Sequence, residues 1–348
     1  MNAIDMHTHW APRGLLQQSE AGKDWYGWRV LRDQTGGEHV TLGERVLAFS
    51  ATRAALKDPA ARAADRLKAE GIGMEALVLT GTFWNYHLDE TDAGRFTREV
   101  NEEIAEVQRA YPDRFRGMAI LPMQHQALAL KELDHAVHHL GLSTVVIATN
   151  VRGLNLDEPA VQPALEAAAK AGVSIVVHPV IWGKPGEERF PRYHFWNSFG
   201  APLESSLAAM SIVYSGLLDR HPDLRIMFTQ GGGWIHFGVG RLNLRYEQRA
   251  DARPMARPPI EYLARMHFDC LVHDDESLAL LKKRAGANRI MIGTDFPAGG
   301  DIIGGAANWI RRSALFSAAE KERVLWRNAA SFLGLDRNPE FVRKWGEA

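Results

Sequence analysis

Two histidines and an aspartate stand close together near the start of the sequence, in the segment AIDMHTH at 3–9. His7 and His9 are two residues apart, and Asp5 is two residues before His7. In a β-strand the side chains alternate between the two faces, so we expect all three to share one face. Buried imidazole and carboxylate groups need polar partners. A metal ion is one such partner, and a solvated N-terminal strand is the alternative that these seven residues leave open.

Eight short apolar segments that are suited to β-strands recur along the chain, and helical segments fill most of the gaps between them. The predicted strands are 3–9, 75–82, 114–123, 143–150, 173–179, 224–232, 267–272 and 289–297, and the clearest predicted helices are 92–112, 128–141 and 158–172. Several strands are almost continuously apolar, which is typical of strands buried on both faces. Strands that alternate with helices predict an α/β protein with a (β/α)8 TIM barrel, formed by one domain over 1–348. The seventh strand is the weakest of the eight.

Two connections are longer than the regular alternation requires. More than sixty residues separate the first two strands, including the polar and aromatic sequence at 25–43, and 180–205 separates the fifth strand from the sixth. Both follow a strand, so both are expected over the C-terminal face, where barrel enzymes keep their active sites. We interpret them as an insertion and a long loop that form pocket walls or lids, with insertions of no functional role as the alternative.

Two further residues with metal-binding side chains end predicted strands. His178 ends the fifth strand and Asp295 ends the eighth, while His7 and His9 end the first. The C-terminal ends of barrel strands meet around one axis, so these four side chains are expected to converge. Neutral imidazole and carboxylate suit zinc, manganese or iron, and room for water would make the site catalytic. The fourth strand lacks a lysine that could be carbamylated to bridge two ions, which favours one divalent ion.

The composition is that of an ordinary globular protein. Of 348 residues 46% are hydrophobic and 24% charged, and the formal net charge is −1, which argues against nucleic acid or a membrane surface as a partner. The single cysteine, Cys270, excludes a disulfide within the chain and a four-cysteine metal site. No segment reaches the roughly 18 apolar residues of a membrane helix, so a cytoplasmic location is the default expectation.

The sequence resembles the amidohydrolase superfamily. The segments that carry the resemblance are AIDMHTH, GRFTREVNEEIAEVQRAYPDRFRGMAILPMQ, VVHP, APLESSLAAMSIVYSGLLDRHPDLRIMFTQGGGW, HFDCLVHD and RIMIGTDFPAGG. They are similar to the branch of metal-dependent decarboxylases typified by aminocarboxymuconate semialdehyde decarboxylase (amidohydrolase-related family 2), over residues 3 to about 335. The resemblance implies a mononuclear site with His7, His9, His178 and Asp295 as ligands, with zinc as the first expectation and manganese or iron as alternatives.

One position departs from the pattern of that family. The sixth strand of relatives usually ends in His-Gly-Gly-Gly, and that histidine handles a proton, whereas this sequence reads FTQGGGW with Gln230 in its place. An amide does not exchange a proton near neutral pH but forms hydrogen bonds. Three alternatives follow: Asp295, His236 or His273 carries the proton; Gln230 serves only to position substrate or water; or the chain has changed its reaction or lost catalysis.

The resemblance also suggests residues for the substrate and for assembly. Arg241 matches an arginine that faces a substrate carboxylate in relatives, sometimes across a dimer interface. Trp10 and Trp182 follow the first and fifth strands and could stack on a planar substrate, and His273 in LVHD fits a family position. The region after the fifth strand, with the segment APLESSLAAMSIVYSG, resembles the dimer-forming region of the branch and predicts a homodimer.

These observations favour a metal-dependent lyase, a decarboxylase of an unsaturated or aromatic carboxylic acid. The ion would polarise the substrate and stabilise the charge that develops as the bond to the carboxylate breaks. Asp295 would be both a ligand and a proton carrier. The alternatives are a metal-dependent hydrolase of an ester, lactone or amide, an iron-dependent oxygenase, and a catalytically altered metal-binding subunit. The sequence does not choose the substrate or the metal.

Overall fold

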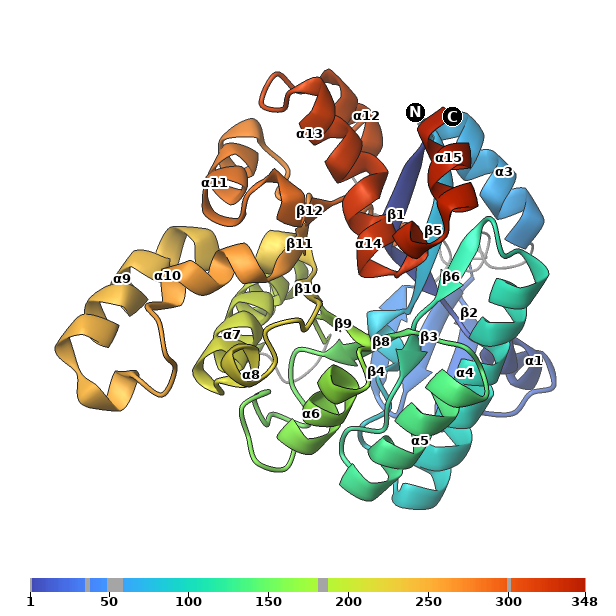
Figure 1. Cartoon of the computed structure of the whole chain (residues 1–348). Coiled ribbons are helices and arrows are strands. Elements are labelled where there is room, and N and C mark those ends of the chain that lie inside the picture. The colour runs from blue at the N-terminus through green and yellow to red at the C-terminus, as the bar shows by residue number, and fades with distance from the viewer. Residues whose placement is uncertain (1, 35–37, 49–58, 181–186, 299–301, 348) are drawn as a thin grey trace.

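The computed structural model of the protein describes residues 2–34, 38–48, 59–180, 187–298 and 302–347. Parallel strands form its centre (Figure 1). In chain order they are β1 (Ala3–Trp10), β5 (Ile72–Leu79), β6 (Phe115–Gly117) continued by β7 (Ala119–Ile120), β8 (Thr144–Ala148), β9 (Ser174–His178), β10 (Ile226–Phe228), β11 (His267–Asp269) and β12 (Ile290–Met291). Every position of β1, β5, β8 and β9 is buried, as their apolar sequences predict.

The strands close on themselves. Hydrogen-bonded pairing runs from β1 through β5 to β6, and from β7 through β8, β9, β10 and β11 to β12. The chain passes from β6 to β7 over Met118, and two parallel bridges, Asp5 with Ile292 and Thr8 with Phe296, connect β12 back to β1. The prediction of a (β/α)8 barrel is therefore confirmed, and all eight predicted strands are present.

The sixth and eighth strands are shorter than the sequence predicts. The apolar segments at 224–232 and 289–297 contribute only Ile226–Phe228 and Ile290–Met291 to the sheet. The remainder of each segment leaves the strand conformation, because the backbone takes positive φ angles at Gln230, Gly231 and Asp295. Apolar periodicity does not show where a strand ends and its loop begins.

Helices surround the barrel. The predicted helices correspond within a few residues to α4 (Glu90–Ala110), α5 (Gln126–His138) and α6 (Gln162–Lys170). Asp89 caps α4 by accepting the Asp92 N–H at 2.9 Å. The later helices are α7 (Ala201–Tyr214), α8 (Leu217–Arg220), α9 (Ile235–Gln248), α10 (Pro259–Tyr262), α11 (Asp275–Ala285), α12 (Ala306–Arg312), α13 (Ala318–Glu322), α14 (Asn328–Phe332) and α15 (Pro339–Glu347). Within the described residues, none of the helices combines the length and hydrophobicity that a membrane crossing requires.

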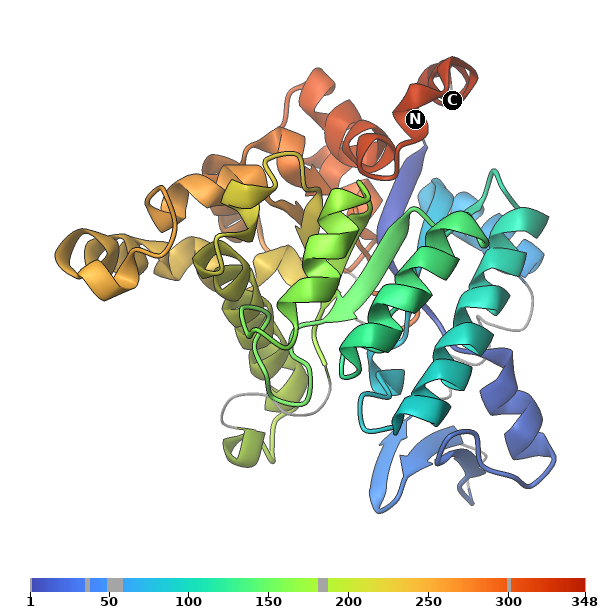
Figure 2. The ribbon, with the colours of Figure 1, turned by 60° about the horizontal axis from the view of Figure 1, so that its bottom comes forward.

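The long connection after β1 has secondary structure of its own. It contains α1 (Arg13–Glu20), an antiparallel sheet of β2 (Trp28–Arg32), β3 (Glu38–Leu42) and β4 (Arg45–Ala48), and then α3 (Pro59–Glu70), which packs against β5. In both ribbon views this sheet and the arm of α9 and α10 lie on opposite sides of the barrel (Figures 1 and 2). After β9, residues 181–186, and with them Trp182, lie outside the described residues.

Candidate metal centre

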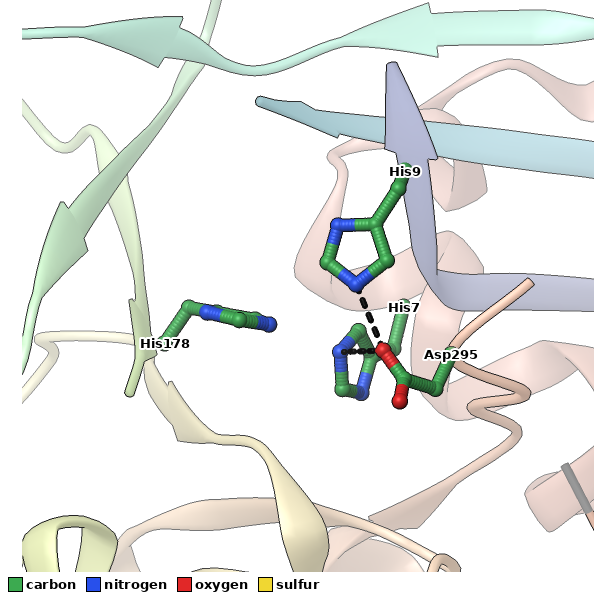
Figure 3. Close-up of side chains that lie close together, drawn as sticks. All are labelled: His7, His9, His178 and Asp295. Carbon is green, nitrogen blue, oxygen red and sulfur yellow. Dashed lines mark hydrogen bonds and ion pairs between the residues drawn. The ribbon is translucent and has the colours of Figure 1, made fainter. Parts of the chain in front are cut away.

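The four predicted metal-binding side chains come together at the C-terminal ends of their strands. His7 and His9 lie on β1, His178 is the last residue of β9, and Asp295 follows β12. One ligand atom from each residue lies within 4.8 Å of the others. Figure 3 shows the Asp295 carboxylate in contact with the two β1 imidazoles, and its Oδ1 is 2.5 Å from His9 Nε2 and 3.3 Å from His7 Nε2. The structure therefore brings together the set that the sequence predicts.

The donor atoms of this cluster fit a divalent metal ion. The three imidazole rings are buried and meet edge to face, with centroids 4.9 to 5.3 Å apart. Within the described residues the Nε2 atom of His178 makes no hydrogen bond, and that of His7 has only the 3.3 Å contact with Asp295. Buried polar atoms without partners are costly, and imidazole nitrogen with carboxylate oxygen is a common donor set for zinc and related divalent ions. The cluster is thus suited to a divalent metal.

Hydrogen bonds on the far side of two rings set their orientation. His7 Nδ1–H donates to Asp269 Oδ2 at 2.8 Å, and His178 Nδ1–H donates to the Pro179 carbonyl at 2.8 Å. A proton on Nδ1 leaves the Nε2 lone pair available, which is how outer partners prepare a metal-binding histidine. Sequence reasoning missed Asp269. An acidic residue within the apolar segment HFDCLV was the signal that could have identified it.

Charges within the cluster oppose the effects of burial. Burial alone would lower the pKa of His7, but the hydrogen bonds and charges of Asp269 and Asp295 raise that pKa to about 10. Burial and the nearby His7 and His9 together hold the pKa of His178 well below its ordinary value. Burial would raise the pKa of Asp295, but hydrogen bonds and charge from His7 and His9 outweigh it and lower the pKa well below the usual range. Without a metal ion the centre therefore holds an ionised Asp295, a protonated His7 and a neutral His178, and a divalent ion that binds there would displace the proton of His7.

A cavity of about 790 Å³ opens above the cluster. Asp295 reaches it with a side chain that is 13% exposed, and Gln230, His236 and His273 also line it. Trp234 and other residues from the start of α9 form one wall. The cavity thus connects the centre to solvent and offers three titratable groups besides the amide of Gln230.

Three cavity residues share an unusual backbone conformation. Gln230, His273 and Asp295 have φ angles of 56°, 66° and 56°. This left-handed region is uncommon for residues other than glycine, and its strain is concentrated at functional sites. Asp269 supports the turn after β10 by accepting the backbone N–H groups of Gln230 and Gly231 at 3.0 and 2.7 Å. One buried carboxylate therefore holds both His7 and the turn that carries Gln230.

The other predicted substrate residues have different surroundings. Trp10 is 2% exposed, donates from Nε1 to Glu103 at 2.9 Å and is absent from the cavity lining, so its predicted substrate contact has no support. Trp10 comes directly after His9 on β1, and neighbouring side chains of a strand point to opposite faces, so its indole faces α4 outside the barrel. Arg241 is exposed on α9 and does not line the cavity within this chain. His236 donates from Nε2 to the Gly231 carbonyl at 2.8 Å, and burial lowers its pKa to about 4.

The prediction that Asp5 shares one face with His7 and His9 is wrong. Asp5 pairs with Glu75 of β5 and Thr8 with Leu77, so the register shifts between them and the regular alternation is interrupted. The Asp5 carboxylate pairs with Arg66 of α3 at 2.7 Å and accepts the backbone N–H of His7 at 3.1 Å. Asp5 therefore supports the ligand strand from the helix side and does not orient an imidazole.

Comparisons with known proteins agree with this geometry. The family model described as amidohydrolase matches residues 4–335. A 2-amino-3-carboxymuconate-6-semialdehyde decarboxylase from Dictyostelium discoideum is 32% identical, over 96% of this chain and 92% of its own length. A gamma-resorcylate decarboxylase from Polaromonas sp. is 26% identical over 72% of this chain and 79% of its own. The crystal structure of 5-carboxyvanillate decarboxylase from Sphingomonas paucimobilis superposes with a TM-score of 0.80 at 22% identity, covering 96% of this chain and 99% of that one. With its closed barrel and clustered ligand side chains, the chain belongs to the amidohydrolase family.

Proposed function

We propose that this amidohydrolase-family enzyme is a metal-dependent decarboxylase of an aromatic or unsaturated carboxylic acid. The observation that carries the proposal is the convergence of three imidazoles and one carboxylate, of which Asp295 also lines a cavity of about 790 Å³. Its relatives in Dictyostelium discoideum and Polaromonas sp. are named as decarboxylases of such acids. The cavity volume lies within the usual range for small-molecule sites.

His7, His9, His178 and Asp295 are the proposed ligands of one divalent ion, with zinc as the first expectation and manganese or iron as alternatives. When bound, the ion would supply Lewis-acid stabilisation of negative charge on the substrate. Asp269 keeps the His7 ring turned towards the cluster through their 2.8 Å hydrogen bond. The Pro179 carbonyl does the same for His178.

The remaining chemistry is a proton transfer. Decarboxylation adds a proton to the carbon that bears the carboxylate, and the bond between that carbon and the carboxylate breaks with release of CO₂. Asp295 and His273 line the cavity and are the proposed proton carriers. His236 is a weaker candidate, because its Nε2–H is engaged by the Gly231 carbonyl at 2.8 Å. The Gln230 amide would position substrate or water through hydrogen bonds.

An assay with a panel of candidate substrates distinguishes a lyase from a hydrolase, because only the lyase releases CO₂. Protein stripped of metal and then loaded with zinc, manganese or iron is assayed with aromatic and unsaturated acids, esters, lactones and amides. We expect metal-dependent CO₂ release from at least one acid and no acid release from the neutral compounds. Acid release without CO₂ in every metal form would refute the decarboxylase.

A homodimer is the proposed assembly. Exposed aromatic side chains lie on the segment before α7 and at the start of α9: Phe199 is 47% exposed, Trp234 is 47% exposed and Phe237 is 87% exposed. A second copy of the chain that covers them would also approach Arg241, which lies on the same helix and is the proposed partner of a substrate carboxylate across the two-fold axis.

Light scattering tests the assembly. We expect a dimer for the wild type and a monomer for Phe237→Asp, because a carboxylate would become buried at the interface. The matched control is Val46→Asp, another largely exposed apolar position, which lies on β4 across the barrel. A wild type that stays monomeric at micromolar concentration would refute the dimer.

A further inference from the structure

The helix α3 buries two arginines against the barrel. Arg62 and Arg66 are its buried residues, each 4% exposed and one helical turn apart on the same face. A helix that covers a barrel normally presents apolar side chains to it. A buried guanidinium is costly unless it is paired and hydrogen-bonded. The partners of these arginines therefore indicate what the helix contributes.

Arg66 reaches the place where the barrel closes. Its Nη2 donates to Asp5 Oδ2 at 2.7 Å and to Thr294 Oγ1 at 3.0 Å. The Thr294 hydroxyl donates to the same Asp5 oxygen at 2.5 Å. Asp5 lies on β1 and Thr294 follows β12, so one guanidinium joins the two sides of the seam between the last strand and the first. Within the described residues, the backbone pairing at this seam consists of two isolated bridges and a few hydrogen bonds, among them Asp295 N–H to the His7 carbonyl at 2.8 Å.

The same guanidinium contacts the other neighbour of Asp295. Arg66 Cζ lies 4.3 Å from the centroid of the Phe296 ring, a cation–π distance. Thr294 and Phe296 flank Asp295, and both turn to α3 while the Asp295 side chain turns to His7 and His9. Asp295 has a φ of 56°, and such strained conformations persist where the surroundings over-determine them.

We propose that Arg66 is a positioning residue, which holds Asp295 against His7 and His9 from behind and thereby sets the affinity of the centre for its metal ion. The inference rests on the proposed metal site but not on the decarboxylation. It assigns a function to α3, a part of the connection after β1. Asp5 supports the same side of the centre, because one of its carboxylate oxygens pairs with Arg66 and the other accepts the backbone N–H of His7.

Two variants of Thr294 test the seam while Asp295 stays in place. Thr294→Val removes the hydroxyl at nearly constant volume, and Thr294→Ser keeps the hydroxyl. The matched control is Ser174→Ala, which removes a fully buried hydroxyl that donates to the Phe332 carbonyl at 2.6 Å, on β9, a strand that does not border the seam. The fourth variant, Arg66→Lys, keeps the positive charge but loses the planar fork that contacts Asp5, Thr294 and Phe296.

The readouts are the dissociation constants for Zn²⁺ and Co²⁺, the visible absorption spectrum of the Co²⁺ protein, and the melting temperature of the metal-free protein. For Thr294→Val and Arg66→Lys we expect about 10-fold weaker binding or more, as for other residues that support metal ligands, with an altered Co²⁺ spectrum. Thr294→Ser should stay closer to the wild type. Ser174→Ala should lower the melting temperature with an unchanged spectrum.

The possible results are distinguishable. Wild-type affinity and spectrum in Thr294→Val would overturn the role of Arg66, even if Arg66→Lys fails to fold. An effect of Ser174→Ala on metal affinity equal to that of Thr294→Val would also overturn it, since the loss of any buried hydroxyl would then suffice. A wild type that binds metal but releases no CO₂ would refute the proposed decarboxylase alone. A wild type that binds no divalent ion would refute both.

Discussion

The metal centre and the rim of the cavity above it are built in different ways. Around the centre, His7, His178 and the turn at Gln230 each have a fixed partner, either the Asp269 carboxylate or a backbone carbonyl. At the rim, Trp234 precedes α9 and is 47% exposed, and Phe237 lies in the first turn of α9 and is 87% exposed. The centre is held by several barrel strands, whereas the rim comes from the helices α7, α9 and α11 and from loops.

We therefore assign the chemical step to the centre and the selection of the substrate to the rim. A site held by strands and buried carboxylates tolerates little movement, because two of its imidazoles, His7 and His178, are each fixed by a second hydrogen-bonding group. A rim of half-exposed side chains can change without disturbing the barrel. We therefore expect changes in the centre to abolish metal binding, and changes at the rim to alter affinity for substrates while the metal remains bound.

The largest effect is expected from His178→Ala, which removes an imidazole from the centre. The affinity for Zn²⁺ should fall by at least about 100-fold, the upper end of what loss of a supporting residue alone produces. Elemental analysis and a competitive titration measure it. His138→Ala, an exposed histidine on α5, is the control. Full metal content in the His178 variant would remove this residue from the proposed ligand set.

The next largest effect is expected from Asp269→Asn. The amide keeps the shape of the side chain, but its NH₂ group would face either the His7 N–H or the backbone donors of Gln230 and Gly231. Metal affinity should fall by about 10- to 100-fold, and the melting temperature should fall as well. A dissociation constant within threefold of the wild type would show that Asp269 does not support His7.

Smaller effects are expected at Gln230. If Asp295 or His273 carries the proton, Gln230→Ala should lower kcat/KM by about 10-fold or less, below the 10²- to 10⁴-fold of lost acid–base catalysis. Gln230→His should match the wild type or exceed it. A new imidazole that donates the proton to carbon works protonated, so kcat/KM should then fall as the pH rises through about 6.5.

Profiles of kcat/KM from pH 5.5 to 8.5 check this expectation. Loss of the native activity in Gln230→His alone would mean that the glutamine is fitted to another reaction. Wild-type pH profiles of kcat/KM in both variants would show that the side chain at position 230 does not take part in the reaction.

The smallest effect is expected at the rim. Trp234→Leu should change the ratio of kcat/KM between two acids of different size by about 3- to 10-fold, because a half-exposed wall discriminates less than a closed pocket does. Metal content and the Co²⁺ spectrum should stay as in the wild type. A loss of bound metal in this variant would contradict the separation of centre and rim.

Much of the candidate site was predictable from the sequence. His7, His9, His178 and Asp295 could be placed together because each ends an apolar segment, and the ends of parallel barrel strands meet around one axis. The positions where the strands leave the sheet were not predictable, because apolar periodicity continues through Gln230 and Asp295 into their turns.

What the sequence by itself determined was the barrel and the type of the proposed ligand side chains, since these depend on local pattern and residue chemistry, while the departure at Gln230 was visible only against the family resemblance. Only the tertiary structure decided the partners behind the ligands. The shifted register of β1 turns Asp5 to the helix side, where Arg66, 61 positions along the chain, meets it, and Asp269 reaches His7 across 262 positions. Trp10 turns to Glu103 for its hydrogen bond, 93 positions away. These pairs form because the closed barrel brings distant strands and helices into contact, and no local periodicity records such contacts.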